Sequence, residues 1–219
     1  RYVLWLQQGG LGLPDRDYYL KDDDRSRDIR QRYVAHVSRM LVLLGDDPDR
    51  ARYGAATVLA LETRLAHASM TRVDQRDPYK TYNKMTVAEL AERAPGWEWD
   101  AYLDALGTAS LDDLNVRQPG FFTELARVAQ DTPLEQWRTY LRWHLVRGMA
   151  SSLSSVFDRE SFDFNSKTLQ GVQEQRPRWK RILESMDQHI GEELGQLYVE
   201  RAFSPEAKRR VLELVEDLR

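Results

Sequence analysis

The sequence predicts an all-α protein, a single multi-helix domain of about eight or nine helices with one N-terminal β-strand. Apolar residues recur at helical spacing along most of the chain, and capping residues and prolines mark the helix starts. Only residues 2–8 have the β-branched and aromatic character of a strand. With 219 residues, 42% of them hydrophobic, the chain can bury a sizeable core.

The strand predicted at residues 2–8, YVLWLQQ, is expected to belong to an incomplete β element. The chain begins in this strand without an initiator Met, so we expect its natural partner upstream of Arg1 and interpret the chain as a piece of a longer protein. An unpaired apolar edge attracts other chains. Residues 2–8 are therefore expected to pair with another copy or to be poorly ordered.

The loop at Gly9 to Asp17 contains closely spaced glycines, which raises the alternative of a phosphate-binding loop. The dinucleotide fingerprint G-x-G-x-x-G would need a third glycine where Asp15 stands. A carboxylate there repels a pyrophosphate, and Pro14 blocks the helix that should open inside the motif. The sequence favours an ordered loop over a phosphate site.

Helix signals dominate the first half of the chain. The acidic residues of 21–24 suit a helix N-terminus, an apolar stripe begins at Ile29, and Gly45 ends the helix. Thr86 and Glu89 form a capping box. The predicted elements are a helix that starts at the acidic residues 21–24 and is closed by Gly45, a helix over 50–69, a loop over 70–85, a short helix from Thr86 that ends before Pro95, and a short helix over 99–106.

The second half is predicted to be helical as well. Thr132, Pro133 and Glu135 are in register as an N-cap, an N1 proline and an N3 carboxylate, and they predict the start of a long helix. The predicted elements are helices over 121–130 and 132–156, one helix and a turn within 158–175, and helices over 178–202 and 204–218.

Composition argues against several classes of partner. The net charge of -3, without Lys and Arg runs interleaved with aromatics, argues against a nucleic-acid partner. With no Cys, the chain can form neither disulfides nor thiolate metal sites. No segment of about 18 apolar residues is present that could span a bilayer.

The four histidines, His36, His67, His144 and His189, do not form a metal-binding motif. No two are closer than 31 positions, so no helix presents an i, i+4 pair. HIGEE at His189 has Glu193 where an inverted zinc motif needs its second His, and a solvated helix face is favoured. ASSLSS at 150–155 lacks the setting of a nucleophilic serine. No catalytic or metal residue is predicted, and this chain alone is expected to be inactive and to hold no zinc.

Two polar residues are predicted to lie in the core. Glu62 shares a helical face with Val58 and Leu65, and a buried carboxylate needs donors. We therefore interpret Glu62 as a structural anchor, not as a catalytic acid or base, with Tyr82 to Lys84 as a candidate source of donors. His144 is predicted to be a hydrogen-bonded core histidine on an apolar stripe with Trp137, Leu141 and Leu145.

Several segments, in order along nearly the whole chain, resemble signatures of the neprilysin family of zinc metalloendopeptidases, which includes neprilysin, endothelin-converting enzymes and bacterial PepO-type oligopeptidases. The first is GLGLPDRDYYL, which contains the glycine loop. The matching segments are Gly10–Leu20, Leu59–Ala66, Tyr82–Trp99, Trp143–Arg147, Arg176–Arg181 and Leu194–Lys208.

The resemblance implies two helical lobes around a cavity, in which a catalytic lobe carries H-E-x-x-H and the other lobe caps the cavity and admits small peptides. It implies that residues 1–20 are an N-terminal strand and loop, 21–203 the cap lobe, and 204–219 a helix that leads toward the catalytic lobe. The catalytic lobe is expected beyond Arg219, so no site residue carries over and the substrate-binding residues stay unknown. Zinc and oligopeptide substrates are implied for the full-length protein.

Gln175 and Ile182 stand where animal relatives have cysteines around the PRWK motif. This difference indicates a bacterial-type member of the family. Export of the protein to the periplasm or outside the cell is expected but not established by the sequence. The alternative is a non-catalytic helical module that binds peptides or proteins and has lost the protease. An H-E-x-x-H segment encoded downstream of Arg219 would distinguish the two.

Overall fold

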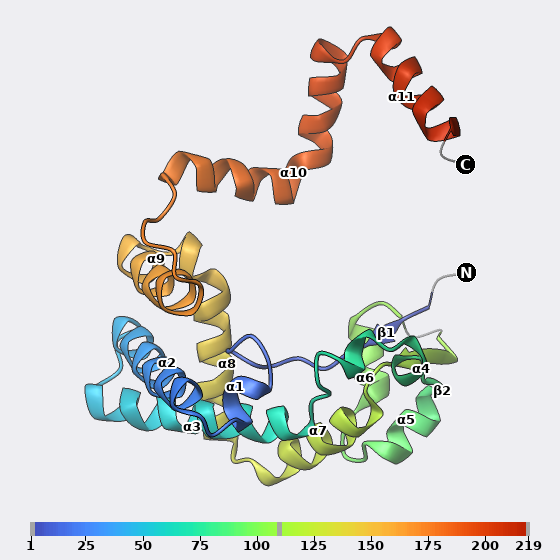
Figure 1. The fold of residues 1–219 in the computed structure, drawn as a ribbon. Helices are drawn as coiled ribbons and strands as arrows, with labels where there is room; N and C mark the ends of the chain where they lie inside the picture. The colour runs from blue at the N-terminus through green and yellow to red at the C-terminus, as the bar shows by residue number, and fades with distance from the viewer. Residues whose placement is uncertain (1–2, 109–110, 218–219) are drawn as a thin grey trace. The chain divides into compact units, whose positions relative to one another are not determined.

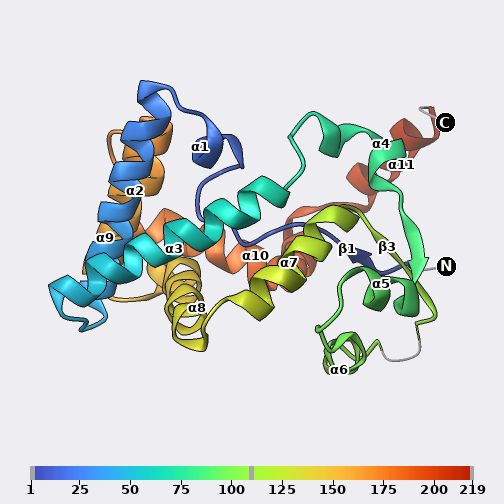
Figure 2. The same cartoon turned by 90° about the horizontal axis from the view of Figure 1, so that it is seen from below.

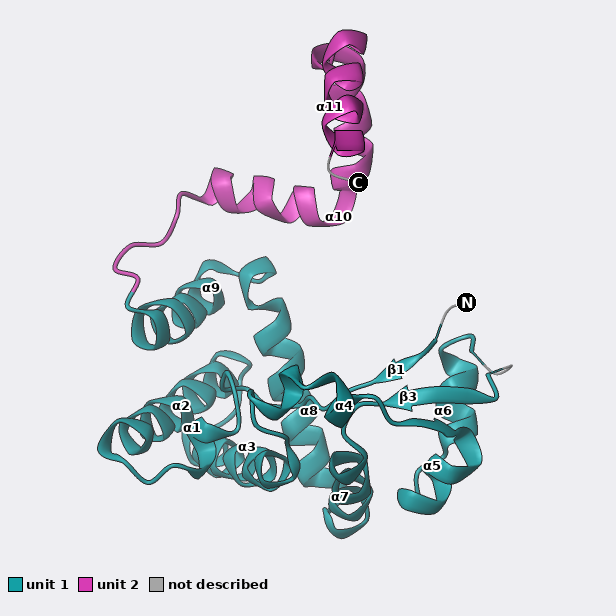
Figure 3. Ribbon diagram, turned by 45° about the vertical axis from the view of Figure 1, so that its right-hand side comes forward, with its two compact units in different colours: residues 1–171 teal, residues 172–219 magenta. Residues whose placement is uncertain are grey.

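The computed structural model describes residues 3–108 and 111–217. Eleven α-helices and one three-stranded sheet occur within these ranges, which confirms the predicted all-α class (Figure 1). The chain divides into two compact units, residues 1–171 and 172–219 (Figure 3). Residue 2 and Leu218, where the first and last predicted elements begin and end, lie outside the described residues.

Unit 1 begins with three helices, α1 (Asp17–Leu20), α2 (Asp24–Leu43) and α3 (Pro48–Ala68). The acidic run starts α2 as expected, because the side chain of Asp23 accepts a hydrogen bond from the Ser26 N–H at 2.9 Å. Asp47 caps α3, with Pro48 in the first turn. The intervening turn uses Gly45 at a φ of 95°, a conformation that favours glycine.

The segment 70–85, predicted as a loop, contains regular structure. It forms a 3₁₀ turn (Asp74–Arg76), α4 (Pro78–Thr81) and the start of β2 (Lys84–Thr86). These elements are too short to show a hydrophobic period, so the loop prediction was wrong. The capping box of Thr86 and Glu89 is confirmed at the start of α5 (Val87–Arg93), and α6 (Trp99–Ala105) follows.

The sheet gives the N-terminal strand a partner within its own chain. β1 (Trp5–Leu6) pairs in parallel with β3 (Asp113–Val116), and β2 pairs with β3 in the antiparallel sense, so the strand order is β1-β3-β2. The expectation that residues 2–8 have no partner in this chain was therefore wrong. Strands of two to four residues offer too little alternation to be recognised in sequence.

The remaining helices of unit 1 are α7 (Pro119–Asp131), α8 (Leu134–Met149) and α9 (Ser155–Phe162), which runs into a π-helical turn at Asp163–Thr168. Thr132 is not the N-cap that was predicted. It ends α7, and Pro133 precedes α8. The long helix expected through residue 156 stops at Met149 and gives way to a 3₁₀ turn (Ala150–Ser152), where Gly148 and the following serines have low helix propensity.

The core of unit 1 consists of two hydrophobic clusters that share α3. Figure 2 shows α3 beside α2, α7 and α8. One cluster joins α3 to α1, α2, α8 and the π-helical turn, and Val58 and Ala66 contribute to it. The other joins α3 to the sheet, α5 and α7, and Leu61 and Leu65 contribute to it. Glu62 therefore lies on the helix where the two clusters meet.

Unit 2 consists of α10 (Arg178–Ala202) and α11 (Pro205–Asp217). The backbone of α10 is kinked at Ile190, where φ is -135° and ψ is 23°. None of the described residues of these two helices is buried. Within the described part of the chain, no helix combines the length and the apolar character needed to cross a membrane.

Candidate functional site

Glu62 lies at the centre of a buried hydrogen-bonded cluster. Its side chain is 0% exposed. The Tyr19 hydroxyl donates to Oε2 at 2.6 Å, and the Tyr33 hydroxyl lies 2.9 Å from Oε1 and 2.8 Å from Oε2. His144 Nε2 lies 2.9 Å from Oε1. Because a carboxylate accepts, the His144 tautomer that fits carries its proton on Nε2.

The tyrosines join the carboxylate to the surrounding backbone and helices. The Tyr19 hydroxyl accepts from the Leu13 N–H at 2.8 Å, and the Tyr33 hydroxyl accepts from Trp143 Nε1 at 2.9 Å. Burial, together with the neighbouring Glu62 charge, raises the pKa of Tyr19 and Tyr33 well above the usual value. Both hydroxyls therefore keep their protons and serve as donors to Glu62.

The glycine loop folds directly over this cluster. The Tyr140 hydroxyl donates to Gly10 O at 2.7 Å, and Arg147 Nη2 donates to Gly12 O at 3.0 Å. A Cβ atom on Gly12 would lie 1.8 Å from the Tyr33 hydroxyl. Gly12 thus allows the backbone to approach the tyrosine closely, which gives the ordered loop a packing role.

The donors to Glu62 differ from those predicted. Tyr82 is exposed, and Asn83 Nδ2 donates to the carbonyls of Lys80 and Arg117, so the segment 82–84 does not supply them. Sequence reasoning missed Tyr19 and Tyr33. Tyr33 stands on the apolar stripe of α2, and a hydroxyl at such a position was the available signal for a buried partner.

His144 forms the expected hydrogen bond, but only part of the predicted stripe around it is buried: Trp137 packs against the core, whereas the two leucines do not. Leu141 and Leu145 are exposed, and the buried face of α8 carries Tyr140, Trp143 and Val146. At about 100° per residue, Leu141 and Leu145 lie on roughly the opposite side of the helix from Trp143, and apolar residues on both sides left the choice of the buried face open in the sequence. His144 lies at the margin of the buried face, 21% exposed.

A second histidine–glutamate pair joins α2 to α9. His36 Nδ1 lies 2.8 Å from Glu160 Oε1, which also accepts from Arg39 Nε at 2.9 Å. The His36 ring stacks on Phe164 of the π-helical turn with a centroid distance of 4.6 Å. Burial lowers the pKa of His36, although Glu160 opposes the shift. Burial would raise the pKa of Glu160, but the hydrogen bonds from His36 and Arg39 lower it overall.

The histidines do not converge on a metal site. They lie on α2, α3, α8 and α10, and His189 Nδ1 is 2.6 Å from the Ser185 carbonyl of its own helix. Among the described residues, no group of three His, Asp or Glu side chains could hold a metal ion.

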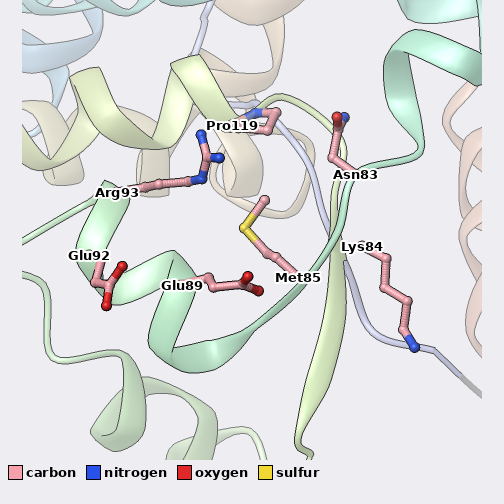
Figure 4. Close-up of a pocket in the computed structure, with 7 residues that line it drawn as sticks. All are labelled: Asn83, Lys84, Met85, Glu89, Glu92, Arg93 and Pro119. Carbon is pink, nitrogen blue, oxygen red and sulfur yellow. The ribbon is translucent and has the colours of Figure 1, made fainter.

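A surface depression of about 580 Å³ lies beside β2 and α5 (Figure 4). Its charged groups have partners or lie apart: Lys84 pairs with Asp113, Glu89 caps α5, and the Arg93 guanidinium turns toward Pro119. No convergent set of polar groups marks it as a preformed ligand site.

The fold and the cluster define a mainly helical domain whose hydrophobic core contains one buried, hydrogen-bonded carboxylate. Comparison with protein families matches residues 1–219 to peptidase family M13. The chain belongs to this family. The resemblance to neprilysin-like metallopeptidases is thereby confirmed.

Individual relatives agree with this assignment. Endothelin-converting enzyme-like 1 of Mus musculus is 31% identical over 100% of this chain and 28% of its own length. Membrane metallo-endopeptidase-like 1 of Mus musculus is 28% identical over 100% of this chain and 30% of its own length. The cryo-EM structure of the Mycobacterium tuberculosis zinc metalloprotease Zmp1 in its open state superposes with a TM-score of 0.92 at 35% identity, covering 100% of this chain and 34% of that one. The chain thus spans about a third of the length of these relatives.

Proposed function

We propose that this chain is the cap-lobe region of a zinc metalloendopeptidase that hydrolyses oligopeptides. The observation that carries the proposal is the match of the entire chain to a metallopeptidase family whose members are about three times as long. Residues 1–20 would form the N-terminal strand and loop, 21–203 the cap lobe, and 204–219 a helix toward the catalytic lobe. In the whole protein, zinc would activate a water molecule for peptide hydrolysis.

The role of this region in the proposal is to restrict access to the catalytic cavity. A lobe that selects substrates by size must keep its shape, and rigid elements with locked side chains achieve this. The Glu62 cluster supports such a role, because one carboxylate connects α1, α2, α3 and α8. Glu62 would act as a structural anchor that holds these helices together.

Two measurements test the proposal. The 219-residue chain should contain no tightly bound zinc and should not cleave a fluorogenic oligopeptide, whereas the polypeptide encoded by the whole gene should contain zinc and lose its activity to a chelator. One zinc per 219-residue chain, or chelator-sensitive cleavage by it, would contradict the proposal. A whole gene product without H-E-x-x-H and without cleavage would favour the non-catalytic binding module instead.

Size selection has its own test in the whole gene product. Cleavage rates over a series of peptides of increasing length should fall steeply beyond a limiting size. Folded or protein-sized substrates cleaved as fast as short peptides would contradict the restriction of access while leaving the peptidase assignment intact.

A further inference from the structure

β1 has one paired edge and one open edge. On the paired side, the Asn115 N–H donates to Leu4 O and the Arg117 N–H donates to Leu6 O, each at 2.9 Å. Backbone groups alternate between the two sides of an extended strand. The N–H and C=O groups of the alternate residues, Val3, Trp5 and Gln7, therefore point away from β3. No strand lies on that side of β1 in the described part of the chain.

The side chains beside the open edge are apolar and exposed. Val3 is 42% exposed and Trp5 is 51% exposed, and the Arg117 guanidinium lies 5.6 Å from the Trp5 ring centroid. Residues 3–7, VLWLQ, include no proline and no charged residue, the devices that usually prevent edge-to-edge pairing.

The opposite edge of the same sheet is protected. At β2, the outward N–H of Thr86 donates to Glu89 Oε2 at 2.7 Å, and Lys84 places a charge on the strand. β2 also passes directly into α5. The contrast indicates that the sheet is built to end at β2 and to continue beyond β1.

We propose that the outer edge of β1 binds an extended, largely apolar β-strand from the part of the family-length protein that these 219 residues do not span. Relatives are about three times as long as this chain, and a strand in the same polypeptide is present at a high effective concentration. A second copy fits less well, because an edge of five residues, about 17 Å long, buries far less than the roughly 1,200 Å² of a stable interface. The proposal rests on family membership and not on the cap-lobe role.

Hydrogen exchange at single residues tests this proposal, with the amide of Leu6 as an internal control because it lies on the paired side. In the 219-residue chain, the Leu6 amide should be protected, while the Trp5 and Gln7 amides should exchange freely. In the polypeptide encoded by the whole gene, the Trp5 and Gln7 amides should become protected, independently of protein concentration.

Three results would overturn the proposal. Free exchange of Trp5 and Gln7 in both proteins would show that nothing binds the edge. Protection that appears only as concentration rises would assign the edge to a second copy, and a gene that encodes no residues beyond these 219 would remove the occupant.

A Trp5→Lys variant should lower the melting temperature of the longer protein by several degrees and leave that of the 219-residue chain nearly unchanged. None of these outcomes bears on peptide cleavage.

Discussion

The two histidine–glutamate pairs of unit 1 bury opposite partners. In the Glu62–His144 pair the carboxylate is 0% exposed and the imidazole 21%, whereas in the Glu160–His36 pair the imidazole is 1% exposed and the carboxylate 15%. Their N···O distances are nearly the same, 2.9 and 2.8 Å. The N···O distance alone therefore does not determine what each pair contributes to the free energy of unfolding.

The two pairs differ in how completely the buried side chain is hydrogen-bonded. Both oxygens of Glu62 accept hydrogen bonds, and three side chains supply them. His36 has one partner at Nδ1, and its buried Nε2 is one of the atoms without a hydrogen-bond partner among the described residues. We expect the first pair to be sensitive to removal of a side chain and the second to be sensitive to acid.

The largest effect is expected for Glu62→Ala, which leaves two buried hydroxyls without their acceptor. The free energy of unfolding should fall by about 3 kcal/mol, measured by urea denaturation. Glu92→Ala, at an exposed position on α5, is the matched control and should change little. An unchanged urea midpoint for Glu62→Ala would count against the anchor role.

Gly12→Ala tests whether the glycine loop belongs to the Glu62 cluster. The added Cβ would collide with the Tyr33 hydroxyl, which its hydrogen bonds to Glu62 and Trp143 hold in place. We expect a loss of about 2 kcal/mol in the same assay. Gly9→Ala is the control, since a Cβ there meets nothing within 4 Å. Equal stability of the two variants would separate the loop from the cluster.

His144→Ala removes one donor and leaves both tyrosines on Glu62. The expected loss is about 1 kcal/mol, the usual value for a single hydrogen bond. In a double-mutant cycle with Glu62→Ala, the effects should be clearly non-additive, because the histidine has no role in the cluster once its acceptor is gone. Additive losses would show that the two side chains act independently.

The smallest effect should appear in the pH dependence of stability. Because burial lowers the pKa of His36 below the usual histidine value of about 6.5, the folded state binds fewer protons than the unfolded state in acid. The free energy of unfolding should therefore begin to fall as pH drops through about 6.5. Glu160, whose pKa is also lowered, adds a loss in the same direction at lower pH.

Urea titrations at several pH values measure this effect. The charged groups that face His36 are Glu160, Arg39 and Arg147. His36→Gln cannot titrate and should flatten the stability profile near neutral pH, while His67→Gln, at an exposed position, should not. A profile that His36→Gln leaves unchanged would assign the acid sensitivity to other groups.

The sequence by itself determined the helical class, most long helices and the capping box at Thr86, because helical periods and caps are local signals that span many residues. The pattern around Glu62 also placed a carboxylate on an apolar face. The family could also be recognised from the sequence, because the resemblance rests on motifs in a fixed order along the chain and not on tertiary contacts.

Only the tertiary structure decided which groups meet. Tyr19, Tyr33 and His144 come from 43, 29 and 82 positions away from Glu62, and no local pattern records such separations. The pairing of β1 with β3 likewise joins segments more than 100 residues apart through very short strands. The physical reason is that buried polar groups and strand edges are satisfied by whatever the fold brings within hydrogen-bonding distance, and sequence periodicity reports only which side of an element is buried.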